Sequence, residues 1–485
     1  MSDKKITEFL GSACLRTAAV KADSRAVQEG DVFVAIQGTV RDGHDYIRDA
    51  MQKGAGTIVC EHIPEGLAGQ GKGRFVVVDD TRKTLGAVAK KIFNDPSNGM
   101  KVYGVTGTNG KTTTVFLIRN VLKAAGVSSG LVSTVFTVTK NNTYSRSEMT
   151  TPDTLTLNRL LSDMSAGKKE AAVIEISSHA LSQGRVCGIG LDSAIFCNIS
   201  PEHLDFHKNM DVYLRDKSRI FGLLKPGGTG VVNADDPMVS GITGSADIPF
   251  LVSFGIRHSA DIKGENIRSV PGGTEFDINT RGQGKFHIKT GLIGVHNVYN
   301  MLGATACLLY GGISVNSIKK GMENALPVPG RLEAIQSMAP FRVFVDYAHT
   351  PDALEHVLRC LRDLTEGRLI CVFGCGGDRD RTKRPVMGQI AANICDHVIL
   401  TSDNPRNENP EEILYQIEKG MLGKTNYSII SLREEAIHRS LEMAAKGDIV
   451  IIAGKGHEDY QIIGEDVIHF DDREVARCVL GERGY

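Results

Sequence analysis

The chain has 485 residues, which is too many for one hydrophobic core, because domains commonly contain about 100 to 200 residues each. We therefore expect about three domains, and a hydrophobic fraction of 41% with a charged fraction of 23% excludes a disordered chain. Lys+Arg 56 against Asp+Glu 57 leave a net charge of -1, so no overall basic field exists to bind nucleic acid or a membrane surface.

The N-terminal segment MSDKKITEFL is charged and lacks the apolar stretch of a signal peptide, and no run in the chain reaches the ~18 apolar residues of a membrane span. The ten cysteines form no zinc-type CxxC pair, and a chain of this length needs no disulfide framework. Cys371 and Cys375 flank a glycine-rich strand end, which favours a structural role over metal binding. We expect a cytoplasmic protein with reduced thiols, no nucleic-acid partner and no membrane insertion.

The first block alternates short β-type runs with helical segments. The runs are DVFVAI (31–36), TIVC (57–60) and RFVVVDD (74–80). Proline, glycine and asparagine then gather in NDPSNG at 94–99, and a cluster of this kind is typical of a boundary. We place the first domain at 1–97 and the second at 98–328.

The second block begins with a strand, a glycine loop and a helix. The strand is KVYGVTG, and TTTVFLIRNVLKAAG follows it with helical apolar spacing and with Gly126 placed to suit a C-terminal cap. Further β-type runs, with helical patterns between them, are AAVIEIS (171–177), LDSAIFCNIS (191–200) and GVVNA (230–234). This alternation predicts a doubly wound α/β domain.

The third block begins near PVPGRLE (327–333), and we place its domain at 329–485. Four apolar strand candidates there each end in a polar loop that holds glycine or proline: FRVFVDYA (341–348), RLICVFGCGG (368–377), HVILTSDNPR (397–406) and DIVIIAGKGHE (448–458). Because ligands of parallel α/β sheets gather at the carboxyl ends of the strands, we expect these four loops to line one cleft.

The segment GVTGTNGKTTT (104–114) ends in the Gly-Lys-Thr of a phosphate-binding loop, although Val105 stands where the strict pattern has its first glycine. A tight structural turn is the alternative interpretation. In the functional one, backbone N–H groups hold phosphates, Lys111 reaches the terminal phosphates and Thr112 binds Mg²⁺. The sequence has no N-K-x-D guanine motif, which favours ATP over GTP. The expected phosphate ligands are Gly107, Thr108, Asn109, Gly110, Lys111, Thr112 and Thr113.

Eight further segments extend the pattern through the second and third blocks. They are TTPDTLTL (150–157), EISSHALSQGRV (175–186), NISPEHLDFHKNMDVYLRDK (198–217), GVHNVYN (294–300), DYAHTPDAL (346–354), GCGGDRDRTKRP (374–385), DNPRNENP (403–410) and GKGHE (454–458). In order and context they resemble the Mur ligase family, and the resemblance extends over all three blocks. The branch of the family that it indicates joins meso-diaminopimelate to UDP-MurNAc-L-Ala-D-Glu in peptidoglycan precursor synthesis.

The resemblance implies three α/β domains: an N-terminal domain for the UDP end, a central P-loop ATPase-type domain and a C-terminal Rossmann-like domain for the amino acid. It implies an ATP-dependent ligase, active as a monomer, that phosphorylates the D-glutamate γ-carboxylate and lets an amine displace the phosphate. This chemistry suits the residues, because a carboxylate is a poor acyl donor and the protein then has to position reactants and neutralise charge.

For catalysis, the resemblance assigns Lys111 to the phosphates and Thr112, Glu175 and His203 to magnesium. It also implies that Lys217 is carbamylated, because a protonated ammonium cannot bind a cation whereas a carbamate can. The alternatives are a solvent-exposed carboxylate at an edge strand for Glu175, a plain helix-start histidine for His203 and a solvated lysine for Lys217.

For the acceptor substrate, the resemblance implies contacts from Thr150, Thr151, Ser177 and Arg185. In the first block, DSR at 23–25 resembles a uridine-binding segment with Ser24 as its main candidate, followed by Gly43 and His44. A helix cap is the alternative for the hydroxyl groups, and a surface charge is the alternative for Arg185.

For adenine, we expect Asn297 and Asn300 together with His296, since amide side chains both donate to and accept from a base edge. Arg331 and Asp346 occupy positions where the family's C-terminal domain closes over ATP. Closure of this kind assembles a site and excludes water from a reactive acyl phosphate.

For the amino acid, Arg406 is the expected partner of the distal carboxylate, because a guanidinium holds a carboxylate with two parallel hydrogen bonds. The residues expected to assist it are Asp403, Asn404, Pro405, Gly454 and Glu458, with Arg379 nearby. Asn409 departs from the acidic residue usual in this segment, but it lies outside the DNPR tetrad that specifies the substrate.

Three alternatives remain at the level of the sequence. Folylpolyglutamate synthetase shares the phosphate loop and the ligation chemistry but lacks the N-terminal block and the DNPR…GKGHE pair. A P-loop switch or scaffold protein has no need of the ligand-rich strand ends in the third block. Lysine in place of diaminopimelate is the third alternative, and lysine-adding relatives lack DNPR.

Overall fold

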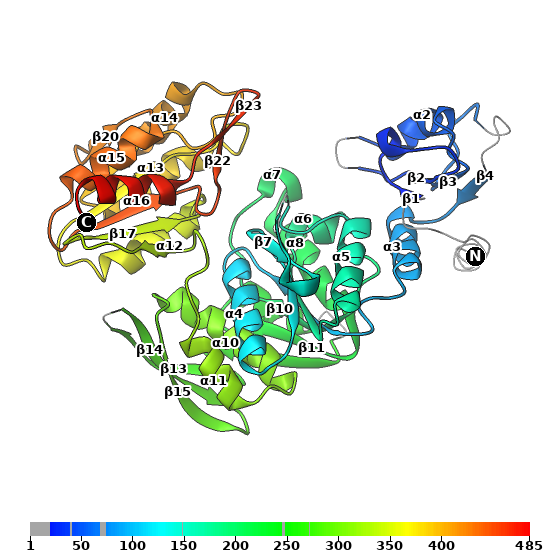
Figure 1. Cartoon of the computed structure of the whole chain (residues 1–485), viewed down its shortest axis with the longest axis horizontal. Helices are drawn as coiled ribbons and strands as arrows, with labels where there is room; N and C mark the ends of the chain where they lie inside the picture. Colours follow the sequence, from blue (N-terminus) through cyan, green and yellow to red (C-terminus); the bar gives the residue numbers. More distant parts are fainter. Residues whose placement is uncertain (1–19, 39–40, 68–73, 148, 245–247, 271) are drawn as a thin grey trace.

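The computed structural model describes residues 20–38, 41–67, 74–147, 149–244, 248–270 and 272–485, so the charged segment MSDKKITEFL lies outside the described residues. Figure 1 shows three blocks, with the N-terminal and C-terminal blocks on opposite sides of the central one. Each block has its own sheet and its own hydrophobic core. Among the described residues, no helix is long and apolar enough to cross a bilayer.

The N-terminal block is a parallel four-stranded sheet in the order β1-β2-β3-β4. Its strands are β1 (Val20–Lys21), β2 (Val32–Val34), β3 (Thr57–Cys60) and β4 (Arg74–Val77), and its helices are η2 (Ser24–Ala26), η3 (Gly43–Tyr46), α2 (Ile47–Gln52) and α3 (Thr81–Ile92). Side chains alternate along β2, so Val32 and Val34 enter one core and Phe33 enters the core on the other face. Helix α3 also packs against α5 (Thr154–Ala166) and thereby joins the first block to the second.

The central block contains an eleven-stranded sheet in the order β15-β14-β13-β12-β11-β10-β5-β9-β6-β7-β8. Its strands are β5 (Lys101–Thr106), β6 (Ser129–Val132), β7 (Phe136–Val138), β8 (Tyr144–Arg146), β9 (Ala171–Glu175), β10 (Leu191–Phe196), β11 (Leu224–Asn233), β12 (Phe250–Gly255), β13 (Ile262–Val270), β14 (Gly273–Thr280) and β15 (Gly284–Thr290). The middle strands are parallel, as a doubly wound fold requires. The antiparallel run β13–β15 and the β7–β8 edge were not anticipated from the sequence.

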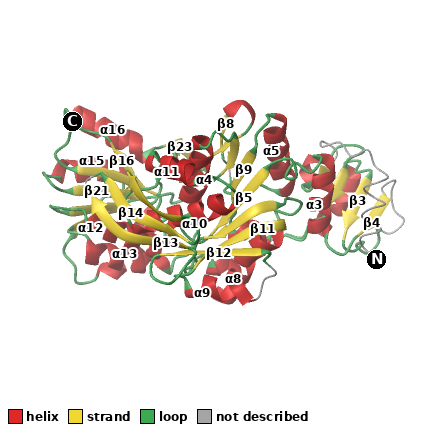
Figure 2. Ribbon diagram, turned by 90° about the horizontal axis from the view of Figure 1, so that it is seen from below, coloured by secondary structure: helices red, strands yellow, loops and turns green. Residues whose placement is uncertain are grey.

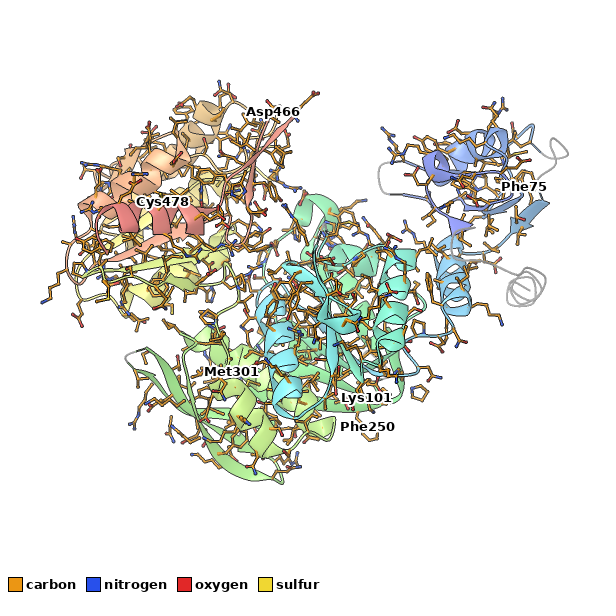
Figure 3. The ribbon with its side chains drawn as sticks, viewed as in Figure 1. Phe75, Lys101, Phe250, Met301, Asp466 and Cys478 are labelled. Atoms are coloured by element: carbon orange, nitrogen blue, oxygen red, sulfur yellow. The ribbon has the colours of Figure 1, made fainter. Side chains whose placement is uncertain are left out.

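Helices cover both faces of the central sheet, as Figure 2 shows in red against the yellow strands. They are α4 (Lys111–Ala124), η4 (Lys140–Asn142), α5, α6 (Ser178–Ser182), α7 (Leu204–His207), α8 (Met210–Ser218), η5 (Arg219–Leu223), α9 (Pro237–Ser240), η6 (Gly241–Gly244), α10 (Val295–Tyr310) and α11 (Val315–Glu323). Helix α10 is almost wholly buried, and Met301, labelled in Figure 3, lies in the core that it shares with α4. This burial fixes α4, and with it the loop that precedes α4, against the sheet.

The C-terminal block has a six-stranded sheet in the order β16-β17-β21-β18-β19-β20 and a separate β22–β23 hairpin, with Asp466 at its turn in Figure 3. The strands are β16 (Glu333–Ile335), β17 (Arg342–Asp346), β18 (Leu369–Phe373), β19 (His397–Leu400), β20 (Tyr427–Ile429), β21 (Ile449–Ala453), β22 (Tyr460–Ile463) and β23 (Asp466–His469). The helices are α12 (Pro351–Arg362), α13 (Lys383–Ile394), α14 (Pro410–Glu418), η7 (Lys419–Met421), α15 (Arg433–Met443) and α16 (Asp472–Glu482). The strands β17, β21, β18 and β19 are parallel, so their carboxyl ends meet at one edge.

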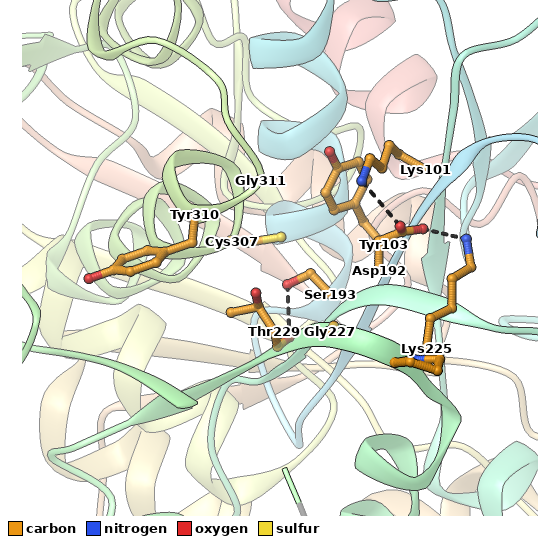
Figure 4. A pocket seen from close by; sticks show the side chains of 12 residues that line it. Lys101, Tyr103, Asp192, Ser193, Lys225, Gly227, Thr229, Cys307, Tyr310 and Gly311 are labelled. Atoms are coloured by element: carbon orange, nitrogen blue, oxygen red, sulfur yellow. Dashed lines mark hydrogen bonds and ion pairs between the residues drawn. The ribbon is translucent and has the colours of Figure 1, made fainter. Parts of the chain in front are cut away.

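In the central block, a pocket of about 190 Å³ lies at the amino ends of the parallel strands, where β5, β10 and β11 begin (Figure 4). Two lysines flank Asp192 there: Lys101 Nζ is 3.4 Å and Lys225 Nζ is 2.6 Å from its carboxylate. Lys225 also donates to the carbonyl oxygens of Ser97 and Met100. The lysine therefore fastens the linker between the first two blocks to the central sheet.

A buried ion pair stabilises the edge of the C-terminal sheet at which the carboxyl ends of its parallel strands meet. Arg433 on α15 donates from Nε and Nη2 to the two carboxylate oxygens of Asp472, at 2.7 Å each, and neither side chain is exposed. Its remaining donors bond the carbonyl oxygens of Ser402, two residues after β19, and of Ala453, the last residue of β21. The guanidinium therefore ties two of the four converging strand ends together.

We predict that Arg433→Met lowers the free energy of unfolding by about 3–5 kcal/mol, because Asp472 is left as an unpaired buried charge. The matched control Arg439→Met, on the same helix but in an exposed pair with Glu442, should cost about 0–1 kcal/mol. Urea unfolding of both variants checks this, and equal losses would contradict it.

Candidate functional site

The loop after β5 has the geometry of a phosphate cradle. It runs from Gly107 to Gly110, and α4 begins at Lys111, so the unpaired N–H groups of the first helical turn face the loop. Gly110 has a φ of 83°, which favours glycine, and a Cβ there would overlap Asn300 Oδ1. Lys111 Nζ donates to the carbonyl oxygens of Gly107 and Thr108, at 3.0 and 2.8 Å, and so lies folded across the loop.

Two hard oxygen donors meet at the start of α4. Thr112 Oγ1 donates to Glu175 Oε1 at 3.0 Å, and the other carboxylate oxygen of Glu175 accepts from Thr134 N at 3.0 Å. Glu175 is only 1% exposed at the end of β9, an interior strand, so the alternative of a solvent-exposed edge carboxylate does not hold. A hydroxyl and a carboxylate are donors that Mg²⁺ prefers, and this pair fits such an ion.

Lys217 on α8 is also brought to the loop. Its side chain is buried, its Nζ donates to Gly107 O at 2.7 Å, and it lies 4.6 Å from the centre of the Tyr213 ring. Burial, with the Lys111 ammonium as the next cause, lowers the pKa of Lys217 well below its ordinary value. The solvated lysine is therefore excluded, and a neutral amine is the form that reacts with carbon dioxide.

His203 stands apart from this group. It precedes α7 in the left-handed conformation, with φ 54°, and its side chain is 42% exposed. Its ring contacts His179, and its Nε2 lies 3.6 Å from the Glu202 carboxylate. No hydrogen bond between described residues joins it to Thr112 or Glu175. Within the described ranges no cluster of three or more His, Cys, Asp or Glu side chains is placed to hold a metal, so the expected set depends on the threonine and the lysine.

Glu202 is a site residue that the sequence reasoning missed. Burial tends to raise its pKa, but His203 and Lys111 together lower the pKa of its carboxyl below the ordinary value. His349 from the C-terminal block lies 3.9 Å from the same carboxylate. The signal was present in PEHLDFH, where an acid stands directly before the histidine.

The predicted acceptor residues of the central block lie together around Glu175. Thr151 Oγ1 donates to the main-chain oxygen of Glu175 at 2.8 Å and accepts from Ser177 N at 3.0 Å. Thr150 Oγ1 accepts from Thr134 Oγ1, and Arg185 Nη1 donates to Thr151 O. Ser177 also caps α6, so its capping interpretation holds as well.

The candidates of the first block lie far from the phosphate loop, in the N-terminal sheet. His44 is buried and uses both ring nitrogens within the block: Nδ1 bonds Asp42 at 2.6 Å and Nε2 accepts from Glu61 N at 2.9 Å. Ser24 Oγ donates to Asp49 at 3.4 Å, and Gly43 leaves no room for a Cβ against Ile36. These residues shape the block, and their role toward a ligand stays a prediction.

The expected adenine residues lie at the start of α10. Asn297 Nδ2 donates to Ile293 O, and Asn300 Nδ2 donates to Asn297 Oδ1. Asn300 Oδ1 accepts from Thr114 on α4, so this side chain braces the phosphate loop. Burial lowers the pKa of His296 to about 4, which leaves its ring neutral at pH 7.

The C-terminal block contributes Arg331 directly to the loop. Its Nη2 donates to Thr112 Oγ1 at 3.4 Å, and its guanidinium lies over the Tyr347 ring at 4.4 Å. Its buried Nε has no partner in the described part of the chain. Asp346 accepts from Leu332 N and Ala348 N, and burial raises the pKa of its carboxyl, so it anchors the turn that carries Arg331.

The expected amino-acid residues meet where β19 and β21 end. Asn404 Nδ2 donates to Glu458 Oε2 at 2.9 Å, and a Cβ on Gly454 would crowd Asp403 Oδ2. Arg406, which follows Pro405 in the loop after β19, donates from Nη1 to Gly377 O at 2.8 Å. Arg379 is exposed beside this loop.

Lys455 and Asn409 complete the description of these loops. Lys455 was missed from the sequence: it is fully buried and lies 3.3 Å from Glu458, and the GKGHE motif itself contained it. Asn409 caps α14 by accepting from Glu411 N, a role that Asn and an acidic Asp fill equally well.

Comparison with known proteins finds three matching family models. The Mur ligase family catalytic domain matches residues 16–92, the Mur ligase middle domain matches 105–308, and the Mur ligase glutamate ligase domain matches 330–456. A curated relative from Clostridium acetobutylicum, UDP-N-acetylmuramoyl-L-alanyl-D-glutamate--2,6-diaminopimelate ligase 1, is 41% identical over 99% of this chain and 98% of its own.

Solved structures agree with these matches. A structure of UDP-N-acetylmuramoyl-L-alanyl-D-glutamate--2,6-diaminopimelate ligase is 32% identical, with a TM-score of 0.68 over 96% of this chain and 95% of that one. MurF ligase from Thermotoga maritima in complex with ADP has a TM-score of 0.63 at 22% identity and covers 96% of this chain and 99% of its own, which shows a shared fold.

We predict that Gly110→Ala weakens nucleotide binding at least tenfold, because its Cβ displaces Asn300 from the loop as well as straining the backbone. Gly126→Ala is the matched control: its φ of 78° is as unfavourable, but no atom lies within 4 Å of the added Cβ. Titration with a fluorescent ADP analogue measures the difference, and the prediction is wrong if both variants bind as the unmodified protein does.

Proposed function

Because this chain belongs to the Mur ligase family, we propose that it is an ATP-dependent ligase that joins meso-diaminopimelate to UDP-N-acetylmuramoyl-L-alanyl-D-glutamate. The observation that carries the proposal is the 41% identity over nearly the whole length to a relative named for this reaction. The convergence of Lys111, Thr112 and Arg331 at one loop supports it, because phosphoryl transfer between two anions needs several positive or polar groups at one point. The proposed setting is cytoplasmic peptidoglycan synthesis by a monomer.

The reaction has two steps. The γ-phosphoryl group of ATP passes to the D-glutamate γ-carboxylate, which gives an acyl phosphate and ADP. The diaminopimelate amine then attacks the acyl carbon, the C–N bond forms as the C–O bond to phosphate breaks, and the amine loses a proton. The phosphate loop and Lys111 hold the nucleotide, while Arg331 compensates the charge that develops on the transferring group.

Magnesium would be held by Thr112 and Glu175, with His203 and a carbamate on Lys217 proposed as further ligands. When bound, it would neutralise charge between ATP and the D-glutamate γ-carboxylate. Thr150, Thr151, Ser177 and Arg185 are proposed for the acceptor, and Ser24, Gly43 and His44 for its uridine end. The residues proposed to bind the amino acid are Asp403, Asn404, Pro405, Arg406, Gly454, Glu458 and Arg379. Those proposed to bind the nucleotide are His296, Asn297, Asn300 and Asp346. The proposed domains remain 1–97, 98–328 and 329–485.

The proposal is tested by phosphate release and product mass with UDP-MurNAc-dipeptide, ATP and either diaminopimelate or lysine. Diaminopimelate should support turnover, whereas lysine should not. Arg406→Met should lower kcat/KM for diaminopimelate about 10- to 100-fold, as expected for lost charge-assisted hydrogen bonds. Arg439→Met, a control on an exposed surface, should leave it unchanged. Preference for lysine would remove diaminopimelate from the proposal.

Replacing Lys217 with Ala should abolish turnover, and a short-chain carboxylate should restore part of it by supplying the missing oxygen ligand. In the unmodified protein, ¹³C-bicarbonate should give a carbamate NMR signal that Lys217→Ala lacks. Full activity of the unrescued variant would refute the role of Lys217.

A further inference from the structure

Asp352 is a carboxylate of the C-terminal block that lies against the phosphate loop of the central block. It stands in the first turn of α12, after the cap residue Thr350. Its Oδ2 accepts from Asn109 Nδ2 at 2.7 Å and from Ser200 Oγ at 3.0 Å. One oxygen atom is therefore bonded by two side chains from another block, 243 and 152 residues away in the sequence.

Both partners of Asp352 belong to the wall of the phosphate loop. Asn109 lies inside the loop, and its backbone N–H donates to Asn198 Oδ1 at 2.8 Å. Ser200 N donates to Thr108 Oγ1 at 3.0 Å. The carboxylate thus contacts the loop directly through Asn109 and indirectly through Ser200.

A purely local role for Asp352 accounts for less of this geometry. An acid in the first turn of a helix is favoured by the helix dipole, but Thr350 already caps α12 by accepting from Ala353 N. Among the residues that the structure describes, Glu355, one residue before His356 on the same helix, bonds only Arg359 on its own helix. The two contacts across the block boundary are what distinguish Asp352.

The charge of Asp352 is compensated on its other oxygen. His356 Nδ1 lies 3.3 Å from Oδ1 and also bonds the main-chain oxygen of Asp352 at 2.7 Å. The Asp352 carboxylate, with this main-chain bond as a further cause, raises the pKa of His356 to about 9. At pH 7 the imidazolium and the carboxylate together are neutral, so the pair adds no net negative charge beside bound phosphates.

We propose that Asp352 is a positioning residue that fastens the C-terminal block to the phosphate loop and so couples nucleotide affinity to domain closure. The inference rests on the proposed function for the assignment of a nucleotide to this loop. A contact between blocks forms only when they are together, and it therefore stabilises the closed state alone. If nucleotide is held by the closed state, the apparent dissociation constant rises as the closed fraction falls.

The test compares Asp352→Ala and Asp352→Asn with the matched control Glu355→Ala in the full chain. A fluorescent ADP analogue reports nucleotide affinity, small-angle X-ray scattering reports closure, and calorimetry reports affinity for UDP-MurNAc-dipeptide. We expect Asp352→Ala to weaken ADP binding about 5- to 20-fold and to enlarge the radius of gyration, while dipeptide affinity is unchanged. Asp352→Asn keeps one acceptor oxygen and should show a smaller effect, and Glu355→Ala should match the unmodified protein.

A double-mutant cycle with Asn109→Ala isolates the contact. If Asp352 and Asn109 act through their mutual contact, the double variant should bind ADP no more weakly than whichever single variant has the lower ADP affinity. The proposal would be overturned if the fold-losses in ADP affinity of the two single variants multiply in the double variant. It would also be overturned if Asp352→Ala binds ADP as tightly as Glu355→Ala does. If Asp352→Ala does not fold, Ser200→Ala removes one of the same two hydrogen bonds and replaces it in the comparison. Product formation by the unmodified protein is measured separately, and its absence would count against the proposed function and not against the contact.

Discussion

The buried carboxylate of Glu175 is the point on which the arrangement of the site depends. It ends an interior strand, and its oxygen atoms are bonded by Thr112 from the phosphate-loop helix and by Thr134 from the neighbouring loop. Its main-chain oxygen accepts from Thr151, which in turn accepts from Ser177. A buried charge is costly unless it is fully hydrogen-bonded, so these loops are held in one geometry. The nucleotide side and the acceptor side of the site therefore share one anchor.

The site is nevertheless incomplete within the central block. Arg331 reaches Thr112 from a turn that Asp346 anchors in the C-terminal block, and Asp352 reaches Asn109 from the start of α12. A ligase that makes an acyl phosphate has to exclude water while two substrates and a nucleotide are present together. Distribution of the charged groups over two blocks fits this need, because the full set exists only when the blocks are in contact.

The buried elements of the fold could be predicted from the sequence because each carries its own pattern. TIVC is β3 residue for residue, and the apolar runs at 171–177 and 448–458 contain β9 and β21. The antiparallel run β13–β15 was not predicted because only one of its faces is buried. In β14, Phe276 and Ile278 are buried, while Glu275, Asp277 and Asn279 alternate with them and are more exposed. Such alternation with many charged residues is a weak signal beside a continuous apolar strand.

The sequence by itself determined the family, the phosphate loop and the chemical character of the site, because glycine, lysine and hydroxyl groups at fixed spacing report local backbone geometry. Only the tertiary structure decided which of the expected residues meet. It placed Asn300 against Gly110, left His203 partly exposed beside Glu202, and brought Asp352 to the loop. It also showed that both ring nitrogens of His44 are engaged within its own block. Contacts between residues hundreds of positions apart depend on how whole sheets and helices pack, and no local pattern in the chain encodes that packing.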